Sequence, residues 1–141
     1  MTSSKLSNCH ILDLHEIQMF SGCITSLNKD FNSPFTIKRV FYIYDIPSGA
    51  DRGAHAHKQC HQLLVALTGS FEVEVFDGIN SCLFTLDQPN RGLHIPPGIW
   101  ASEINFSGGA ICLVLASMEY EENDYIRDID TYKRLKNGVH L

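Results

Sequence analysis

The sequence predicts an all-β protein of a single domain over residues 1–141, and three observations support that prediction. Short runs rich in β-branched and aromatic residues recur from Phe35 onward. Turn residues separate these runs at regular spacing, and no long helical period lies between them. The length is sufficient for one buried core. Strands in this arrangement are typical of a sandwich or a barrel.

The expected strands follow one another along the chain. Residues 36–45 form the strongest run. Residues 63–67 and 71–76 flank Gly69-Ser70, which is a hairpin signal, and the second run alternates apolar and acidic residues as a half-exposed strand does. Further strands are expected at residues 81–86, 93–95 and 110–116.

The two ends of the chain have a different character. Residues 11–17 fit either a strand or a helix, and we favour an edge strand that two subunits exchange. In the tail, residues 120–127 and 131–136 carry apolar residues at near-helical spacing. The tail is therefore expected to form one or two short helical segments that pack on the barrel.

Composition and charge exclude several classes of function. The formal net charge of −5 leaves no broad basic face for nucleic acid, and no segment has the basic amphipathic pattern of a membrane-surface helix. Polar residues interrupt the first twenty positions, so neither a signal peptide nor a membrane span is expected there. The five cysteines contain no C-x-x-C pair. We therefore expect a cytoplasmic protein with reduced thiols.

His55-Ala56-His57 is the most informative motif in the chain. Alternate residues of a strand point to the same face, so both imidazoles should project together into a barrel. The spacing around the pair resembles the first motif of the cupin superfamily, and a later segment resembles the second. The two segments are Gly49-x5-His55-x-His57-x4-Gln62-x6-Gly69 and Pro96-Pro97-Gly98-Ile99-Trp100-Ala101-x3-Asn105.

The cupin resemblance implies a double-stranded β-helix, or jelly-roll barrel, and it also bears on metal binding. In cupins the position of Gln62 usually holds a glutamate ligand, and the position of Ala101 holds the last histidine. With these two ligands replaced, we expect no metal, because catalytic metal sites use at least three protein ligands. His61 or His94 can in principle supply a third ligand, but neither lies in a motif position. Imidazoles without a metal are free to exchange protons near neutral pH.

Three separated motifs resemble the bacterial sugar 3,4-ketoisomerases that act on dTDP-4-dehydro-6-deoxyglucose. The resemblance implies a homodimeric cupin without metal or cofactor, which binds a dTDP-linked keto sugar and feeds the synthesis of 3-amino-3,6-dideoxy sugars. The motifs are Pro34-Phe35-x-Ile37-Lys38-Arg39-Val40-x-Tyr42, Arg52-Gly53-x-His55-Ala56-His57-Lys58 and Asp124-Tyr125-Ile126-Arg127.

The same resemblance implies roles for individual residues. His57 is expected to remove the hydrogen at C3, which the C4 ketone acidifies, and His55 or Tyr42 to relay the proton between the sugar oxygens. Arg52 is expected either to stabilise the developing enolate or to hold the pyrophosphate. The expected substrate-binding residues are Arg52, Lys38, Gln62, Ala101 and Ser21.

The chain departs from the ketoisomerase pattern at two of these positions. Typical members often carry His or Arg where this chain has Ala101, and some carry Arg where it has Ser21. The stereochemistry at C4 of the product, gluco or galacto, therefore stays open. Two alternatives remain: a cupin 3,5-epimerase, which should show a His-Asp base pair and a Tyr acid that we do not find in the sequence, and a non-catalytic cupin that binds a sugar nucleotide.

Overall fold

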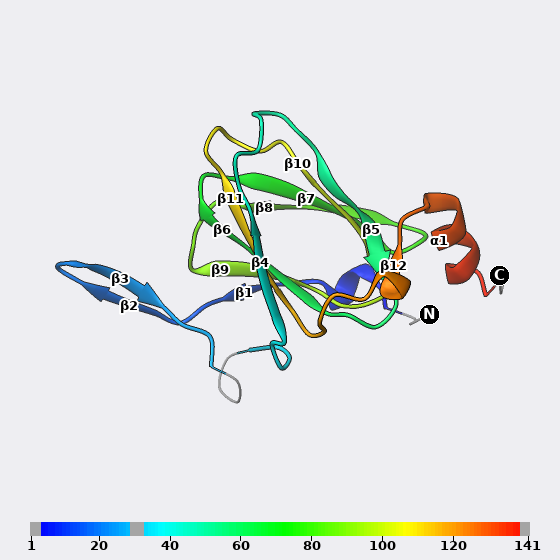
Figure 1. Ribbon diagram of the computed structural model, residues 1–141, viewed down its shortest axis with the longest axis horizontal. Helices are drawn as coiled ribbons and strands as arrows, with labels where there is room; N and C mark the ends of the chain where they lie inside the picture. The colour runs from blue at the N-terminus through cyan, green and yellow to red at the C-terminus, as the bar shows by residue number, and fades with distance from the viewer. Residues whose placement is uncertain (1–3, 29–32, 139–141) are drawn as a thin grey trace.

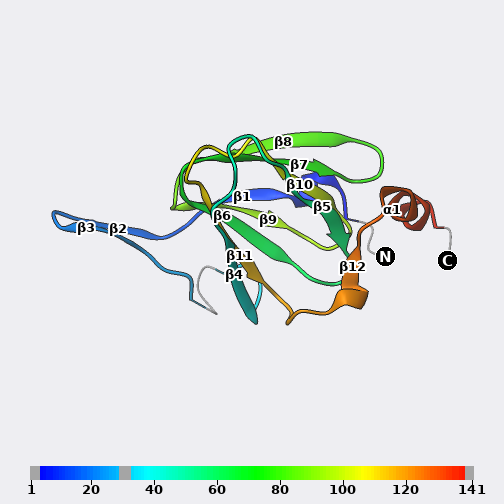
Figure 2. The same cartoon turned by 45° about the horizontal axis from the view of Figure 1, so that its top comes forward.

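The computed structural model describes residues 4–28 and 33–138 and confirms the expected all-β jelly roll. Two five-stranded antiparallel sheets face each other (Figure 1), and Figure 2 shows them as two separate layers. The first sheet has the strand order β1-β9-β6-β11-β4, and the second has the order β12-β5-β10-β7-β8. A separate two-stranded hairpin, β2-β3, precedes them in the chain.

The strands of the first sheet are β1 His10–Asp13, β4 Arg39–Ile43, β6 Gln62–Thr68, β9 Arg91–Ile95 and β11 Ile111–Ala116. The strands of the second are β5 Arg52–His57, β7 Phe71–Phe76, β8 Ser81–Leu86, β10 Trp100–Ile104 and β12 Tyr125–Ile126. The hairpin consists of β2 Glu16–Met19 and β3 Gly22–Thr25. The short helices are the 3-10 turns η1 Leu6–Asn8 and η2 Glu122–Asp124, and the α-helix α1 Ile129–Lys136.

The main core lies between the two sheets, because alternate residues of each strand face inward. Leu64 on β6 packs in the same buried cluster as Val73 on β7, and both are at most 1% exposed. The other face of β6 is buried as well, since Leu63 packs beneath a covering segment that includes Phe35. Burial on both faces explains why residues 63–66 form a continuous apolar run rather than an alternating one, whereas Leu67 at the end of the run is exposed.

The tail forms the second of the two expected helical segments, at residues 131–136, but differs from the expectation over residues 120–127. Residues 122–124 form a single 3-10 turn, and the next two residues form β12, which pairs with the end of β5. The register sets Tyr125 opposite His57 and so brings the tail against the histidine motif. Within residues 4–28 and 33–138, α1 is the only α-helix, and Asp128 caps it by accepting a hydrogen bond from the backbone N–H of Thr131. Among the described residues, no helix is long and apolar enough to cross a membrane.

The N-terminal segment supplies an edge strand, as expected, and an arm that was not expected. β1 pairs with β9 at the edge of the first sheet. The β2-β3 hairpin then projects away from both sheets, as Figures 1 and 2 both show. Four large apolar side chains on this arm are exposed to solvent. They are Ile17, Met19, Phe20 and Ile24.

Candidate active site

Strand β5 carries both motif histidines toward the interior. His55 lies opposite Ala101 of β10, and His57 is buried with 6% exposure. The two imidazole rings meet edge to face, with their centroids 5.0 Å apart. The motif thus forms a pair of adjacent bases at the end of a strand, as the sequence predicts.

A carboxylate fixes the orientation of the His57 ring. Asp124 Oδ2 lies 2.9 Å from His57 Nδ1, and both side chains are buried. The same carboxylate accepts hydrogen bonds from the backbone N–H groups of Gln59 at 2.7 Å and Cys60 at 3.2 Å. Because an ionised carboxylate only accepts hydrogen bonds, Nδ1 carries the ring proton of neutral His57. The lone pair is then on Nε2, which is buried and has no hydrogen-bond partner in the structure.

Burial keeps both imidazoles neutral at physiological pH. Desolvation is the largest cause that lowers the pKa of His55 to about 4, and the neighbouring His57, Arg127 and Arg39 lower it further. The pKa of His57 is also lowered by burial, although the hydrogen bond to Asp124 acts in the opposite direction. Neutral imidazole is the form that accepts a proton, so both rings can act as bases at pH 7.

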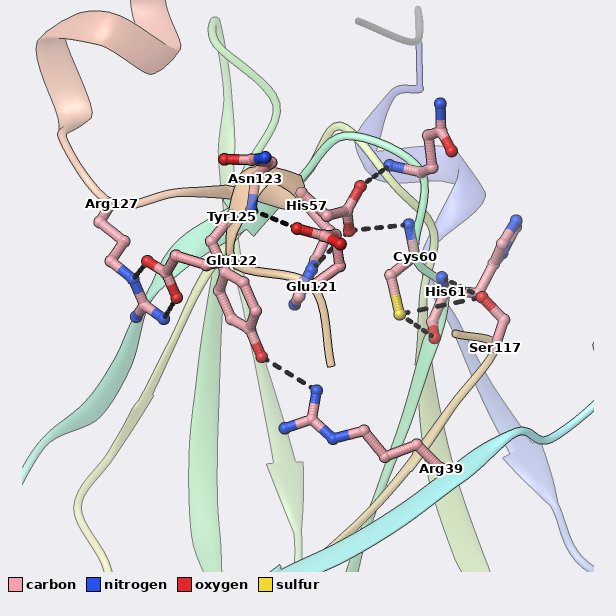
Figure 3. A network of polar contacts seen from close by, with 12 residues as sticks. Arg39, His57, Cys60, His61, Ser117, Glu121, Glu122, Asn123, Tyr125 and Arg127 are labelled. Atoms are coloured by element: carbon pink, nitrogen blue, oxygen red, sulfur yellow. Dashed lines mark hydrogen bonds and ion pairs between the residues drawn. The ribbon is translucent and has the colours of Figure 1, made fainter. Parts of the chain in front are cut away.

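Tyr125 and two arginines, Arg39 and Arg127, lie beside His57 (Figure 3). The Tyr125 ring lies 4.3 Å from the His57 ring between centroids, and an Arg39 guanidinium nitrogen donates to the Tyr125 hydroxyl at 3.2 Å. Arg127 lies over the same tyrosine ring at 4.2 Å and makes a bidentate ion pair with Glu122 at 2.8 and 3.0 Å. Two arginines therefore border the histidine pair, and each can stabilise an anion.

The structure brings some of the expected substrate-binding residues to the histidine pair and leaves others outside. Ala101 and Gln62 are buried on inward faces, the latter in line with Leu64 of β6. Arg52 begins β5, five residues before His57, and is exposed opposite Glu103.

Three expected residues do not join the histidine pair within this chain. Tyr42 lies on the outer face of β4 and is 60% exposed. Lys38, just before the strand, is exposed as well. Ser21 lies at the tip of the arm, between β2 and β3. Tyr125 occupies the place beside the imidazoles that the sequence analysis gave to Tyr42.

Arg39, Asp124 and Tyr125 contribute to the site although none was among the expected site residues. Arg39 lies two residues before Phe41, which faces the core. Residues two apart on a strand share a face, so the strand period predicts that Arg39 also faces inward. Asp124 and Tyr125 belong to a tail motif that the sequence analysis quoted for the resemblance without giving its residues a role. The His57–Asp124 pair and the adjacent tyrosine also supply the features that we expected of an epimerase, so their supposed absence no longer counts against that alternative.

One group of side chains in the site has the composition of a metal centre. The candidate ligand atoms of His57, Cys60 and Asp124 all lie within 4.8 Å of one another. The Asp124 oxygens, however, already accept three hydrogen bonds, and Cys60 Sγ lies 3.3 Å from the carbonyl oxygen of His61, to which it donates. These contacts fit a hydrogen-bonded network that orients His57 better than they fit a metal shell.

A second buried carboxyl group lies near the other end of β5. Glu103 is 7% exposed, and a Cβ atom added at Gly53 would lie 1.8 Å from Glu103 Oε2, so a larger residue there would displace the Glu103 carboxyl group. Gly53 also has φ +77°, a conformation that favours glycine. Desolvation raises the pKa of Glu103 to about 7, while the positive charge of Arg52 opposes this shift.

The chain is similar to known proteins over most of its length. Residues 7–137 match the FdtA family, described as WxcM-like, C-terminal. A TDP-4-oxo-6-deoxy-alpha-D-glucose-3,4-oxoisomerase from Aneurinibacillus thermoaerophilus is 40% identical over 131 residues, which cover 93% of this chain and 94% of the relative.

Solved structures agree with this family match. A 3,4-ketoisomerase from Helicobacter canadensis is 42% identical with a TM-score of 0.89, over 92% of this chain and 98% of the other. A mutant of the 3,4-ketoisomerase QdtA from Thermoanaerobacterium thermosaccharolyticum, in complex with TDP-4-keto-6-deoxyglucose, is 34% identical with a TM-score of 0.91, over 97% and 99% of the two chains. A dTDP-4-dehydrorhamnose 3,5-epimerase from Bacillus anthracis shares only the fold, at 15% identity and a TM-score of 0.75, over 86% of this chain and 79% of the epimerase. The chain therefore belongs to the FdtA (WxcM-like, C-terminal) family, and the oxoisomerase and the two ketoisomerases described above are relatives that match it at 34–42% identity.

Proposed function

We propose that this protein is an isomerase that moves the keto group of dTDP-4-dehydro-6-deoxy-D-glucose from C4 to C3. The observation that carries the proposal is the arrangement of His57, whose Nδ1 is held by Asp124 while Nε2 is buried and has no partner. Buried polar atoms usually have a hydrogen-bond partner, and in this proposal a substrate C–H or O–H group is the partner of Nε2. The substrate class rests on the 40% identical oxoisomerase.

The chemistry requires two proton movements. His57 Nε2 removes the hydrogen from C3, which the C4 ketone acidifies, and O4 is protonated to give an enediol. The enediol then loses the proton on O3 and gains one at C4, which leaves the ketone at C3. His55 is the second base, and the Tyr125 hydroxyl is placed to relay the oxygen proton. Each positioned acid or base contributes on the order of 10² to 10⁴ in rate.

The positive groups have separate tasks in this proposal. Arg39 donates to the Tyr125 hydroxyl and favours negative charge beside His57, so it stabilises the enolate that develops at O4. Arg52 is five residues away along the strand, roughly 16 Å at the usual rise per residue. That separation suits the pyrophosphate better than the reacting carbons, so of the two roles expected for Arg52 we assign it the pyrophosphate.

The proposal includes a homodimer. A lone two-stranded hairpin is marginally stable in water, and the β2-β3 arm exposes four large apolar side chains. Strand β4 exposes Val40, Tyr42 and Tyr44 on its outer face. A second copy of the chain can cover both surfaces, and two-fold symmetry buries each of them twice. The arm would then carry Ser21 to the partner subunit, which accounts for its distance from the histidines of its own chain.

A 3,5-epimerase is the second candidate, because the His57–Asp124 pair beside Tyr125 also suits proton removal next to a C4 ketone. The epimerase neighbour shares the fold alone, whereas the ketoisomerase relatives match over nearly the whole chain. We therefore place the epimerase second. A 3-keto product would be the substrate for an aminotransferase, as in the synthesis of 3-amino-3,6-dideoxy sugars.

A proton NMR time course with dTDP-4-dehydro-6-deoxyglucose in deuterium oxide tests the proposal. We expect a 3-keto sugar that carries solvent deuterium at C4, at a level lowered by internal return of the C3 proton. The coupling constants of the C4 proton, measured in a parallel reaction in ordinary water, distinguish the gluco from the galacto product. Exchange at C3 and C5 with the ketone still at C4 would establish the epimerase instead, and a spectrum that does not change with time would support a binding protein.

A further inference from the structure

Three histidines gather on the outer face of the first sheet, apart from the catalytic pair. His10 on β1 and His94 on β9 are directly paired across the two strands, so their side chains share one face. His61, just before β6, lies on the diagonal from His94, because Leu63 two residues later is the residue paired with His94. Figure 1 shows these three strands as neighbours, with β9 between the other two.

Two of the rings already hold the geometry of neighbouring metal ligands. His61 Nδ1 and His94 Nε2 share a hydrogen bond of 3.0 Å, and the rings lie within 19° of parallel. In a tetrahedral zinc site with Zn–N bonds of 2.0–2.1 Å, two ligand nitrogens are separated by about 3.3 Å. If the two nitrogens moved apart by a few tenths of an ångström, both could therefore bind one cation in place of the hydrogen bond between them.

The surroundings of the pair favour ligation. The backbone of His61 is held by Ser117, whose hydroxyl accepts from the His61 N–H at 2.8 Å and whose N–H donates to the His61 carbonyl at 3.0 Å (Figure 3). The Phe35 ring covers both imidazoles, with centroids 5.8 and 5.7 Å away. A fixed backbone and an apolar cover are features of preorganised metal sites.

His10 supplies the third ligand. It is exposed, and directly opposed residues of an antiparallel pair have Cβ atoms about 4.5–5.5 Å apart, which is within reach of an imidazole that changes rotamer. We propose that His10, His61 and His94 form a binding site for a divalent transition cation such as Zn²⁺, with water as the fourth ligand. The cation would join β1, β9 and the start of β6 on the face opposite the catalytic histidines.

Zinc titration of tag-free protein by isothermal calorimetry tests the proposal. Wild type is compared with His94→Gln, His10→Gln and the control His15→Gln, which removes an exposed histidine from the same N-terminal region. We expect His94→Gln and His10→Gln each to weaken one class of zinc site by at least about tenfold, and His15→Gln to match wild type. Zinc binding at any other site is common to all the variants, so the result is read from the difference between them.

A second measurement keeps the test decisive if His94→Gln does not fold. Cu²⁺ added to wild type and to His10→Gln, whose changed side chain is exposed, is examined by pulsed electron paramagnetic resonance, which counts coordinated imidazoles. The count should fall by one in His10→Gln and stay unchanged in His15→Gln. Zinc isotherms that are identical in wild type and a folded His94→Gln protein, or an imidazole count that His10→Gln does not change, would overturn the proposed three-histidine site.

Discussion

His57 suits the proposed role of base because its two ring nitrogens face different surroundings. Nδ1 contacts the Asp124 carboxylate, while Nε2 is buried and has no hydrogen-bond partner. Asp124 is itself held by two backbone N–H groups, so its position does not depend on a flexible side-chain contact. The pair resembles the histidine–carboxylate part of a hydrolase triad, in which the carboxylate fixes the tautomer and stabilises the imidazolium that forms.

Asp124→Asn should lower kcat by roughly 10² while the protein stays folded, because an amide cannot both accept from His57 and balance the charge of its imidazolium. The measurement is the initial rate of 3-keto sugar formation, with circular dichroism to verify folding. Asp130→Asn, an exposed aspartate in the first turn of α1, is the matched control and should retain wild-type turnover. A folded Asp124→Asn protein with normal kcat would contradict the assigned role.

The pH profile of kcat/KM should reflect the lowered pKa values of the histidines. Protonation abolishes the base, and burial holds the pKa of both rings below 6.5, so activity should persist as pH falls to 6.5 and decline only below it. The Asp124 carboxylate raises the pKa of His57, so Asp124→Asn should move the acid limb to still lower pH. An acid limb at pH 7 or above in the wild type would rule out this assignment.

Strand β4 shows how far the sequence alone defines an element. The strand was predicted from its composition, but apolar side chains occur on both of its faces, so composition does not reveal which face is inward. Phe41 and Ile43 pack on the core with Arg39 in the same alternation, whereas Lys38 and Tyr42 point outward. Lys38 and Tyr42, which the sequence predicted as site residues, therefore lie outside the histidine site of their own chain. Only the pairing of β4 with β11 above the opposite sheet distinguishes the two faces.

Separate substitutions of Arg39 and Lys38 test which face of β4 borders the site. Arg39→Met should lower kcat by about 10² or more, since Arg39 donates to the Tyr125 hydroxyl and stabilises the developing oxyanion. Lys38→Met removes an equal charge from the outer face and should have little effect on kcat. Steady-state kinetics of the two proteins provide the comparison. Equal losses in both variants would indicate a general electrostatic effect and would remove Arg39 from the site.

The tail was the least predictable element, although it completes the site. Its apolar spacing suggested a helix, and the two-residue strand β12 exists only because β5 offers a free edge for pairing. No local pattern in the sequence reports such a tertiary pairing. The histidine pair was found because both histidines lie in one motif, whereas Asp124 is 67 residues from its partner His57. Long-range contacts of this kind explain which part of the site was missed.

Glu103 should couple the stability of the whole molecule to pH. Its folded-state pKa is raised from 4.5 to about 7, so its contribution to stability is complete below pH 4.5 and is lost as pH rises through 7. At ~1.4 kcal/mol per pKa unit the loss is about 3 kcal/mol as an upper limit. Glu103→Gln should therefore unfold at higher urea concentration than wild type at pH 8 and show little difference at pH 5. Glu74→Gln, at an exposed position on β7, is the control and should differ at neither pH. An equal shift at both pH values would mean that ionisation of Glu103 is not the cause.

The exposed apolar side chains of the β2-β3 arm support the proposed homodimer. Phe20 at its tip is fully exposed in the isolated chain, and the outer face of β4 is exposed as well. The sequence indicated an exchanged N-terminal strand, but it did not reveal that the edge strand stays in its own sheet and that the hairpin after it projects outward. Local sequence patterns do not reveal contacts with a second subunit. In the proposed dimer, this explains why Ser21 was expected at a site that lies far from it within its own chain.

Phe20→Asp should convert the proposed homodimer to monomer, because burial of a charge in place of an aromatic anchor costs more than a typical subunit contact supplies. Light scattering at micromolar concentration should report a dimer for wild type and for Gln18→Asp, a control that adds the same charge at a polar position of the arm. If the arm also completes the partner's site, Phe20→Asp should lose turnover in parallel with dimer dissociation. Its activity should then recover when the protein concentration is raised enough to restore the dimer. A wild-type protein that is monomeric at micromolar concentration and fully active would refute both the dimer and the shared site.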